Sequence, residues 1–279
     1  MLRSLFSAIS GLRANQLMLD VTGNNIANAN TPGFKASSVV FQDTLSQMLT
    51  AAGAPTATQG GTNPIQVGLG VQVGAVTNNF NQGSAQTTGR PTNLMISGDG
   101  FFVVKRDGAP IYTRAGAFSF DQDGNLVTPD GDKVQGYPAG TNPGGATSDI
   151  TIADLVNPNQ ANPMKSYNIG ADGVITGVYA DGTQKPLFQI AMANFANPEG
   201  LEKVGDTAFA QSTNSGAVQL GAPGTGRLGK LMAGSLEMSN VDLAQEFTNL
   251  IIAQRGFQAT SRVITTSDQV LEELVNIKR

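Results

Sequence analysis

The chain has 279 residues, with 17 Lys and Arg against 21 Asp and Glu, so its formal net charge is −4. It contains no Cys, no His and no Trp, which excludes the usual structural zinc sites, cysteine nucleophiles and Ser-His triads. A mildly acidic balance gives no reason to expect a nucleic-acid partner. We therefore expect a protein that is not an enzyme and that holds no cofactor and no metal.

The N-terminal segment carries a repeating apolar pattern. Between residues 2 and 28, apolar residues recur at steps of three and four, which predicts an amphipathic helix with a heptad-like seam. Pro32 and Gly33 end it, since both residues interrupt helices. The apolar runs are too short for a cleaved signal peptide or a membrane span. The seam positions that we assign are Leu5, Ile9, Leu12, Leu19 and Ile26.

The middle of the chain changes character twice. Residues 50–64 are rich in Ala, Gly, Thr and Pro without periodicity, which is typical of a flexible loop or an extended connector. From residue 67 onward, short apolar runs alternate with Asp-Gly dipeptides, and this pattern predicts a hairpin-rich antiparallel body. The dipeptides are Asp99-Gly100, Asp107-Gly108, Asp123-Gly124, Asp130-Gly131, Asp172-Gly173 and Asp181-Gly182.

The C-terminal segment repeats the pattern of the first helix. Ser239, with Asp242 three residues later, suggests a capping-box-like start. The β-branched run 263–266 locally favours a strand, but the apolar spacing keeps its phase across it and predicts a helix. Lys278 and Arg279 at the end suit the helix dipole. The seam positions here are Leu243, Phe247, Leu250, Phe257, Ile264 and Leu271.

These patterns predict an α+β fold. The terminal helices, 1–29 with 241–279, form a discontinuous, coiled-coil-like inner domain. Residues 30–77 form a connector, and residues 78–240 form a β-rich antiparallel outer domain. Two arrangements of the helices stay open. They form either an intramolecular hairpin over the β body, or a pair that also meets its copies in neighbouring subunits.

Two short patterns resemble ligand sites only in part. Residues 224–230 satisfy GxxxxGK, but Leu231 stands where a phosphate loop needs Ser or Thr, so a Gly-rich turn is favoured. Residues 121–132 resemble a calcium loop, but Leu126 and Asp132 stand where it needs Gly and usually Glu. A β-turn is favoured there as well.

Two segments, one near each end, carry a more specific pattern. Residues 24–35 read NNIANANTPGFK, and residues 239–243 read SNVDL, followed at 251–259 by IIAQRGFQA. They resemble the terminal signatures of the flagellar rod and hook axial protein family. In the middle, GYPA at 136–139 and ANFANPEGL at 193–201 resemble the hook type (FlgE type) more than the distal rod type. The end of the chain, LVNIKR at 274–279, does so too.

The resemblance implies a structural subunit that polymerises into the flagellar hook, a flexible tubular joint that transmits torque from rod to filament. The distal rod of the basal body is the alternative. The implied partners are other copies in a helical tube, the flagellar rod, the hook–filament junction proteins, the hook cap and the flagellar type III export apparatus. The implied location is the flagellum outside the cell, reached without a cleaved signal peptide. The family signature loop comprises Asn24, Asn25, Asn28, Thr31, Gly33 and Phe34.

An extracellular carbohydrate-binding β module is an alternative of a different class. Such a module needs an exposed aromatic platform, whereas aromatic residues make up 6% of this chain and Trp is absent. It also leaves the two apolar seams without a role.

Overall fold

The computed structural model describes residues 2–56, 60–141, 145–152 and 163–277, so Lys278 and Arg279 lie outside the described residues. The chain forms two compact units. The helical unit comprises residues 1–27, 37–78 and 242–279, and the β unit comprises 28–36 and 79–241. Paired terminal helices together with an antiparallel β body confirm the predicted α+β class.

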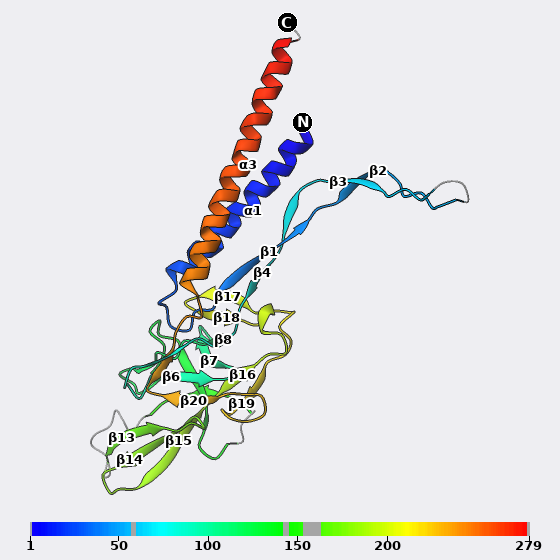
Figure 1. The fold of residues 1–279 in the computed structure, drawn as a ribbon. Coiled ribbons are helices and arrows are strands. Elements are labelled where there is room, and N and C mark those ends of the chain that lie inside the picture. Colours follow the sequence, from blue (N-terminus) through cyan, green and yellow to red (C-terminus); the bar gives the residue numbers. More distant parts are fainter. Residues whose placement is uncertain (1, 57–59, 142–144, 153–162, 278–279) are drawn as a thin grey trace. The chain divides into compact units, whose positions relative to one another are not determined.

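Helices α1 (Leu2–Ala27) and α3 (Leu243–Ile277) lie side by side and antiparallel in the helical unit (Figure 1). Both predicted helices are present, and α3 runs unbroken through the β-branched residues 263–266. The predicted cap is wrong by three residues. Asp242 caps α3, because its Oδ1 accepts the backbone N–H groups of Ala244 (2.9 Å) and Gln245 (3.3 Å), whereas Ser239 lies before the helix.

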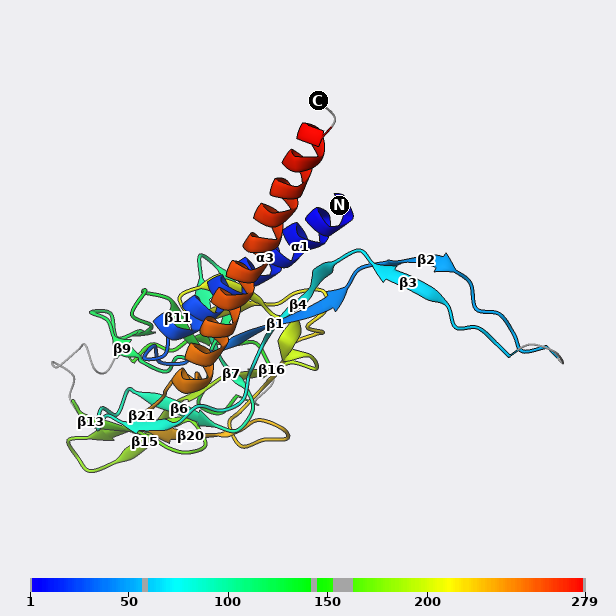
Figure 2. The same cartoon turned by 45° about the horizontal axis from the view of Figure 1, so that its top comes forward.

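The helical unit also contains strands that the connector prediction did not include. Strand β1 (Ser37–Asp43) pairs with β4 (Val71–Asn78), and β2 (Ser46–Thr50) pairs with β3 (Ile65–Gly68), both antiparallel. Figure 2 shows the four strands as one two-stranded ribbon. Residues 37–78 therefore belong to the helical unit rather than to a separate connector. Backbone hydrogen bonds between the strands hold such a ribbon together. Because they do not depend on the side chains, the sequence shows no apolar periodicity in this segment.

The β unit is built on one large antiparallel sheet. Thirteen of the described strands belong to it, and its main path runs β13-β14-β15-β11-β7-β8-β18-β17. Two smaller pairs, β20–β6 and β21–β5, complete the unit. The strands are β5 (Ala85–Thr87), β6 (Leu94–Ser97), β7 (Phe101–Arg106), β8 (Ala109–Thr113), β9 (Ser119–Phe120), β10 (Leu126–Val127), β11 (Lys133–Pro138), β12 (Ser148–Asp149), β13 (Met164–Ile169), β14 (Val174–Tyr179), β15 (Gln184–Ile190), β16 (Met192–Asn194), β17 (Glu202–Gly205), β18 (Ala208–Ala210), β19 (Gln219–Gly221), β20 (Lys230–Ala233) and β21 (Ser235–Glu237), with a short 3-10 helix at Pro198–Gly200.

Five of the six predicted Asp-Gly turns connect strands that pair with each other, with Gly at positive φ in each. The turn at Asp99-Gly100 is the exception, because β6 and β7 belong to different sheets. Gly100 has φ +128, and a Cβ there would lie 2.5 Å from Met192 Cε. The glycine at this position therefore allows a close crossing of the chain rather than a hairpin.

The core of the β unit lies on both faces of the large sheet. Phe102 and Val104 of β7 belong to one apolar cluster, and Phe101 and Val103 belong to the other. Alternate residues of a strand face opposite sides, so the apolar run 101–104 reflects burial on both faces. Phe101 also meets Phe195 edge-on, with ring centroids 5.9 Å apart.

Candidate assembly site

The two helices of the helical unit make their closest contact through small residues. A Cβ on Gly11 would lie 3.2 Å from Thr260 Cγ2, and one on Gly256 would lie 2.6 Å from Asn15 Oδ1. Ala253 is fully buried nearby. Because glycine and alanine let two helix backbones approach closely, these positions set the helix spacing. The apolar spacing of the sequence does not identify these small residues as the contact between the helices.

The structure divides the predicted seam residues into two groups. Most are partly buried, and three are exposed, because a pair of helices buries only one stripe on each. The partly buried residues are Leu5, Leu12, Leu19, Ile26, Leu250, Phe257, Ile264 and Leu271, and the exposed ones are Ile9, Leu243 and Phe247. Their part in contacts between subunits stays a prediction.

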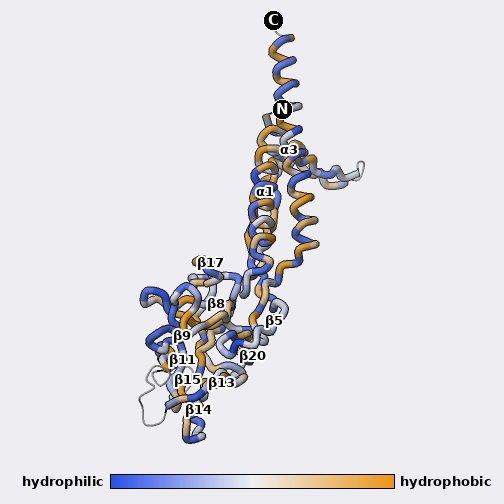
Figure 3. Tube along the Cα trace, turned by 90° about the vertical axis from the view of Figure 1, so that its left-hand side faces the viewer, coloured by the Kyte–Doolittle hydropathy of each residue, from blue (hydrophilic) through white to orange (hydrophobic). Residues whose placement is uncertain are grey.

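Besides its seam residues Leu243 and Phe247, helix α3 exposes further apolar residues. Phe247, Ile251 and Ile252 are 52%, 56% and 57% exposed. Phe247 and Ile251, four residues apart, lie on one side of the helix, and Ile252 lies about 100° further round it. Figure 3 shows apolar colouring along α3 as far as its C-terminal end. Further exposed apolar residues on α3 are Val263, Val270, Leu274, Val275 and Ile277. A helix that is apolar on several sides is suited to several neighbouring helices, and α1 alone covers one side.

Asn25 of the signature loop is a buried residue of the helical unit whose side chain forms hydrogen bonds with the backbone. Its Nδ2 donates to Ser37 O (2.8 Å), and its Oδ1 accepts from Ser37 N (3.0 Å). The side chain thereby satisfies both backbone groups at the start of β1, as a neighbouring strand would. Asn24, by contrast, is exposed on α1.

Glu246 lies beside this amide in the helical unit. Partial burial raises the pKa of Glu246 above its usual value, the charge of Asp242 adds to the shift, and a hydrogen bond with Asn25 opposes it. The start of α3 therefore carries a carboxyl group whose ionisation is disfavoured in the folded chain.

The remaining signature residues form a tight turn in the β unit. Thr31 Oγ1 donates to Asn28 Oδ1 (3.1 Å), and Thr31 N donates to Asn28 O (3.1 Å). Gly33 has φ +72, and a Cβ there would lie 2.5 Å from Ala115 N, so only glycine fits. Phe34 is buried, with Lys203 Nζ 5.2 Å from its ring centroid.

A buried group of three charges follows the turn. Lys35 Nζ lies 2.7 Å from Glu237 Oε1, and neither side chain is exposed. Arg114 NH1 lies 3.4 Å from Glu237 Oε2, and Arg114 Nε has no hydrogen-bond partner among the described residues. Burial lowers the pKa of Lys35 and of Arg114, and the carboxylate opposes both shifts. One anion thus holds two buried cations.

No motif in the sequence indicates a role for Lys35, Arg114 or Glu237 as a group. A signal was available, because only 14% of the residues are charged and Lys35 ends the segment 24–35 that carries the family resemblance. Glu237 also holds the loop by its backbone, since its carbonyl oxygen accepts from Gly33 N (2.8 Å). The buried charges therefore bind the signature turn to β21.

Asn240, within the C-terminal signature, has a similar part in the β unit. Its Oδ1 accepts from Ala36 N (2.9 Å), and its Nδ2 donates to Asn79 O (2.8 Å) and Asn81 O (3.0 Å). One amide thereby satisfies backbone groups of two other chain segments. The sequence pattern marked this residue by resemblance, but it did not indicate the partners.

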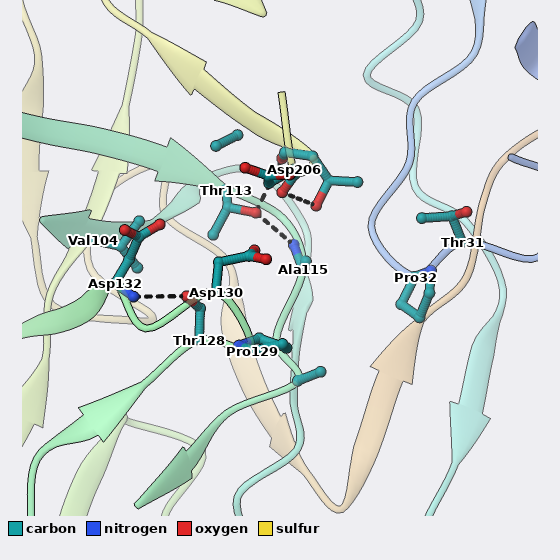
Figure 4. Close-up of a pocket in the computed structure, with 13 residues that line it drawn as sticks. Thr31, Pro32, Val104, Thr113, Ala115, Thr128, Pro129, Asp130, Asp132 and Asp206 are labelled. Atoms are coloured by element: carbon teal, nitrogen blue, oxygen red, sulfur yellow. Dashed lines mark hydrogen bonds between the residues drawn. The ribbon is translucent and has the colours of Figure 1, made fainter. Parts of the chain in front are cut away.

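The β unit contains a hollow of about 290 Å³ beside the signature turn (Figure 4). Its lining includes Pro32, Thr128 and Asp132. Asp132 is already paired, because its Oδ2 lies 2.7 Å from Arg106 NH2. Within the described ranges, no three acidic, Cys or His residues lie close enough to hold a metal ion.

The two ligand-like patterns have local structural explanations. Both oxygens of Asp121 accept hydrogen bonds from Asn125, through its backbone N–H (2.7 Å) and its Nδ2 (2.8 Å). That turn uses the carboxylate that a calcium ion would need. Lys230 begins strand β20, whereas a phosphate loop would lead into a helix. No described helix has the length and apolar character needed to cross a membrane.

Three family models match this chain, one near each end and one in the middle. The family model "Flagella basal body rod protein" matches residues 5–35. "Flagellar hook protein FlgE/F/G D1 domain" matches residues 95–177, and "Flagellar basal body rod FlgEFG protein C-terminal" matches residues 232–277.

Curated relatives match over the whole chain. The flagellar basal-body rod protein FlgG of Bacillus subtilis is 47% identical over 280 residues, covering 100% of both chains. FlgG of Caulobacter vibrioides is 40% identical and covers 97% of each chain. The flagellar hook protein FlgE of Borreliella burgdorferi is 32% identical over 441 residues, covering 100% of both. A crystal structure of Helicobacter pylori FlgE2 matches 72% of this chain and 56% of that one at 12% identity, with a TM-score of only 0.26.

Proposed function

Because this chain belongs to the flagellar hook and basal-body rod protein family, and is thus a structural component of the flagellar axis, we propose that it is a subunit of the basal-body rod. The observation that carries the proposal is the alignment with Bacillus subtilis FlgG, at 47% identity over 280 residues that cover both chains completely. The alignments with the two hook relatives extend over 441 and 463 positions, many more than the 279 residues of this chain. The hook relatives therefore contain long segments that have no counterpart in this chain.

The hook, which the sequence resemblance predicts, is the second candidate. Two observations favour it, namely the hook-like segments 136–139 and 193–201, and the end-to-end match to Borreliella burgdorferi FlgE. In that case the subunit would belong to a flexible joint that transmits torque. The rod proposal instead assigns it to a stiff shaft.

The exposed surface of α3 supports polymerisation in either case. Phe247, Ile251 and Ile252 are each more than half exposed, and fully burying such a side chain stabilises a contact by about 1.5–3 kcal/mol. Contacts of a head-to-tail, non-closing kind generate a helical polymer. In this proposal the helices of neighbouring copies cover the apolar faces of α3 that α1 leaves open.

The proposal extends to partners and location. The chain joins copies of itself and the neighbouring axial proteins of the flagellum, with the hook, its cap and its junction proteins on the distal side. It reaches this place through the flagellar type III export apparatus without a cleaved signal peptide. These partners follow from the family.

Immunogold labelling of isolated hook–basal bodies tests the location. Label confined to the straight rod is the expected result, whereas label along the curved segment outside the envelope would assign the chain to the hook. Absence of label from both would contradict the proposed function. Hook–basal bodies isolated from cells that produce variants also test whether the apolar face of α3 is needed for assembly, because the amount of variant incorporated can be measured.

Ile251→Asp places a charge on the exposed apolar face of α3, and Gln258→Asp places the same charge at an exposed polar position of the same helix. We expect the first variant to be missing from the particles and the second to be incorporated. Equal incorporation of both would contradict a role for this face in assembly.

A further inference from the structure

The last two turns of α3 lie beyond the described beginning of α1. Gly11 faces Thr260 and Asn15 faces Gly256, so the two helices are antiparallel, and a residue nearer the beginning of α1 lies opposite a residue nearer the end of α3. By this register, the first residue of α1, Leu2, lies opposite Gln269 of α3. Residues 270–277 therefore project beyond α1, and Figure 1 shows the C-terminal end of α3 beyond the N-terminal end of α1.

This projecting end carries an apolar stripe. Val270, Leu274 and Ile277 are 45%, 54% and 81% exposed, and their spacing of four and three residues places them on one side of the helix. Glu273 borders the stripe, and among the described residues it forms no salt bridge. At about 1.5 Å per residue the stripe is roughly 10 Å long.

A groove of about 410 Å³ lies elsewhere in the same unit, between α1 and β4. Its apolar lining includes Phe6, Ile9 and Val73, all of which are exposed. Arg13 is its charged residue, and no described residue forms a salt bridge with Arg13. From Phe6 to Arg13 the groove runs for roughly 10 Å, the same length as the stripe.

The groove is held in shape by contacts between α1 and β4. Ser10 Oγ accepts from Val71 N (3.2 Å), and the backbone of Gly70 packs against the same hydroxyl group. Gly70 has φ +130, a conformation that favours glycine. The groove therefore exists before any partner binds, which lowers the entropic cost of binding.

The stripe of a chain cannot enter its own groove. Helix α3 packs on the side of α1 that carries Gly11 and Asn15, whereas Phe6 and Arg13 face β4. Reaching the groove would require breaking the continuous helix α3. A second copy has no such restriction, and its Glu273 would complement Arg13.

We propose that the groove between α1 and β4 binds the C-terminal end of α3 of a second copy, with Val270, Leu274 and Ile277 against Phe6, Ile9 and Val73, and Glu273 beside Arg13. The contact rests on the proposed function, because it joins two different surfaces of identical subunits and so repeats along a polymer. It gives the assembly a defined direction and register.

Cross-linking tests the contact directly, because the chain has no Cys of its own. Cells produce two single-cysteine forms together, one with Leu274→Cys and one with either Ile9→Cys or Arg13→Cys, and the isolated hook–basal bodies are mildly oxidised. A disulfide can then form only between different copies. We expect several-fold more cross-linked dimer than in the control that combines Glu272→Cys, on another side of α3, with the same groove variants.

Charge reversal supplies an independent readout. Arg13→Glu and Glu273→Arg should each lower incorporation into the particles, and the two changes in one chain should restore it. Arg3→Glu and Glu272→Arg are the matched controls, because both are exposed outside the groove and the stripe. No cross-link with either groove variant, or no restoration, in particles that contain the controls would overturn this contact alone. Particles that lack even the unaltered chain would overturn the proposed function and the contact with it.

Discussion

Lys35 and Glu237 are 202 residues apart in the chain, yet their side chains form a salt bridge of 2.7 Å with no exposed surface. Glu237 also meets Arg114 at 3.4 Å and accepts from Gly83 N at 2.9 Å. Desolvation makes such a group costly unless every member is paired. Lys35 and Arg114 therefore both depend on the carboxylate of Glu237 for their counter-charge.

The first prediction concerns this carboxylate. Glu237→Gln should destabilise the β unit by about 3–5 kcal/mol, because two buried cations lose their counter-charge. Lys35→Met should cost less, since Arg114 remains to pair with Glu237. All four tyrosines belong to the β unit and Trp is absent, so tyrosine fluorescence during urea unfolding reports this unit. Equal losses for the two variants would contradict the dependence on Glu237.

The second prediction separates two reasons for glycine in the signature turn. Gly33 and Gly89 have nearly the same φ, +72 and +71, but a Cβ on Gly33 would collide with Ala115 whereas one on Gly89 meets nothing within 4 Å. Gly89→Ala should cost about 1 kcal/mol from the backbone conformation alone. Gly33→Ala should cost clearly more in the same tyrosine-detected unfolding. Equal costs would show that the close approach to Ala115 has no energetic weight.

The third prediction uses a similar pair of glycines in the helices. Gly23→Ala should stabilise the helical unit by about 0.5–1 kcal/mol, because nothing lies within 4 Å and alanine is the better helix former. Gly256→Ala should not stabilise the helical unit, because its Cβ would lie 2.6 Å from Asn15 Oδ1. Circular dichroism at 222 nm during urea unfolding follows the helices. A gain of the same size in both variants would refute the close helix contact.

The fourth prediction concerns pH. The pKa of Glu246 is raised in the folded chain, mainly by burial, above its ordinary value of 4.5. Its contribution to stability is therefore complete below pH 4.5 and declines as the pH rises through the raised pKa. Glu246→Gln should weaken the decline in helix stability as the pH rises above 4.5. The matched control is the exposed Glu272→Gln, and an unchanged pH profile in Glu246→Gln would contradict the prediction.

Both long helices and most of the β-turns were predictable because their causes are local. A helix shows its apolar face every three or four residues, and the phase held even across residues 263–266. An Asp-Gly dipeptide adopts its turn from its own backbone preferences, and five of six formed hairpins. The ribbon of β1–β4 was missed because backbone pairing, rather than an apolar pattern, defines it.

The sequence by itself determined where the helices run, that the body between them is antiparallel, and which terminal segments carry the family signatures. Only the tertiary structure decided which sides of α1 and α3 meet, that Glu237 pairs with Lys35 and Arg114, and that Asn240 holds Ala36 and Asn79. The physical reason is distance along the chain. A local pattern expresses what a residue prefers among its neighbours, whereas close packing and buried charge pairs depend on partners that folding brings together from well over 100 positions away, such as the 123 between Arg114 and Glu237 and the 202 between Lys35 and Glu237.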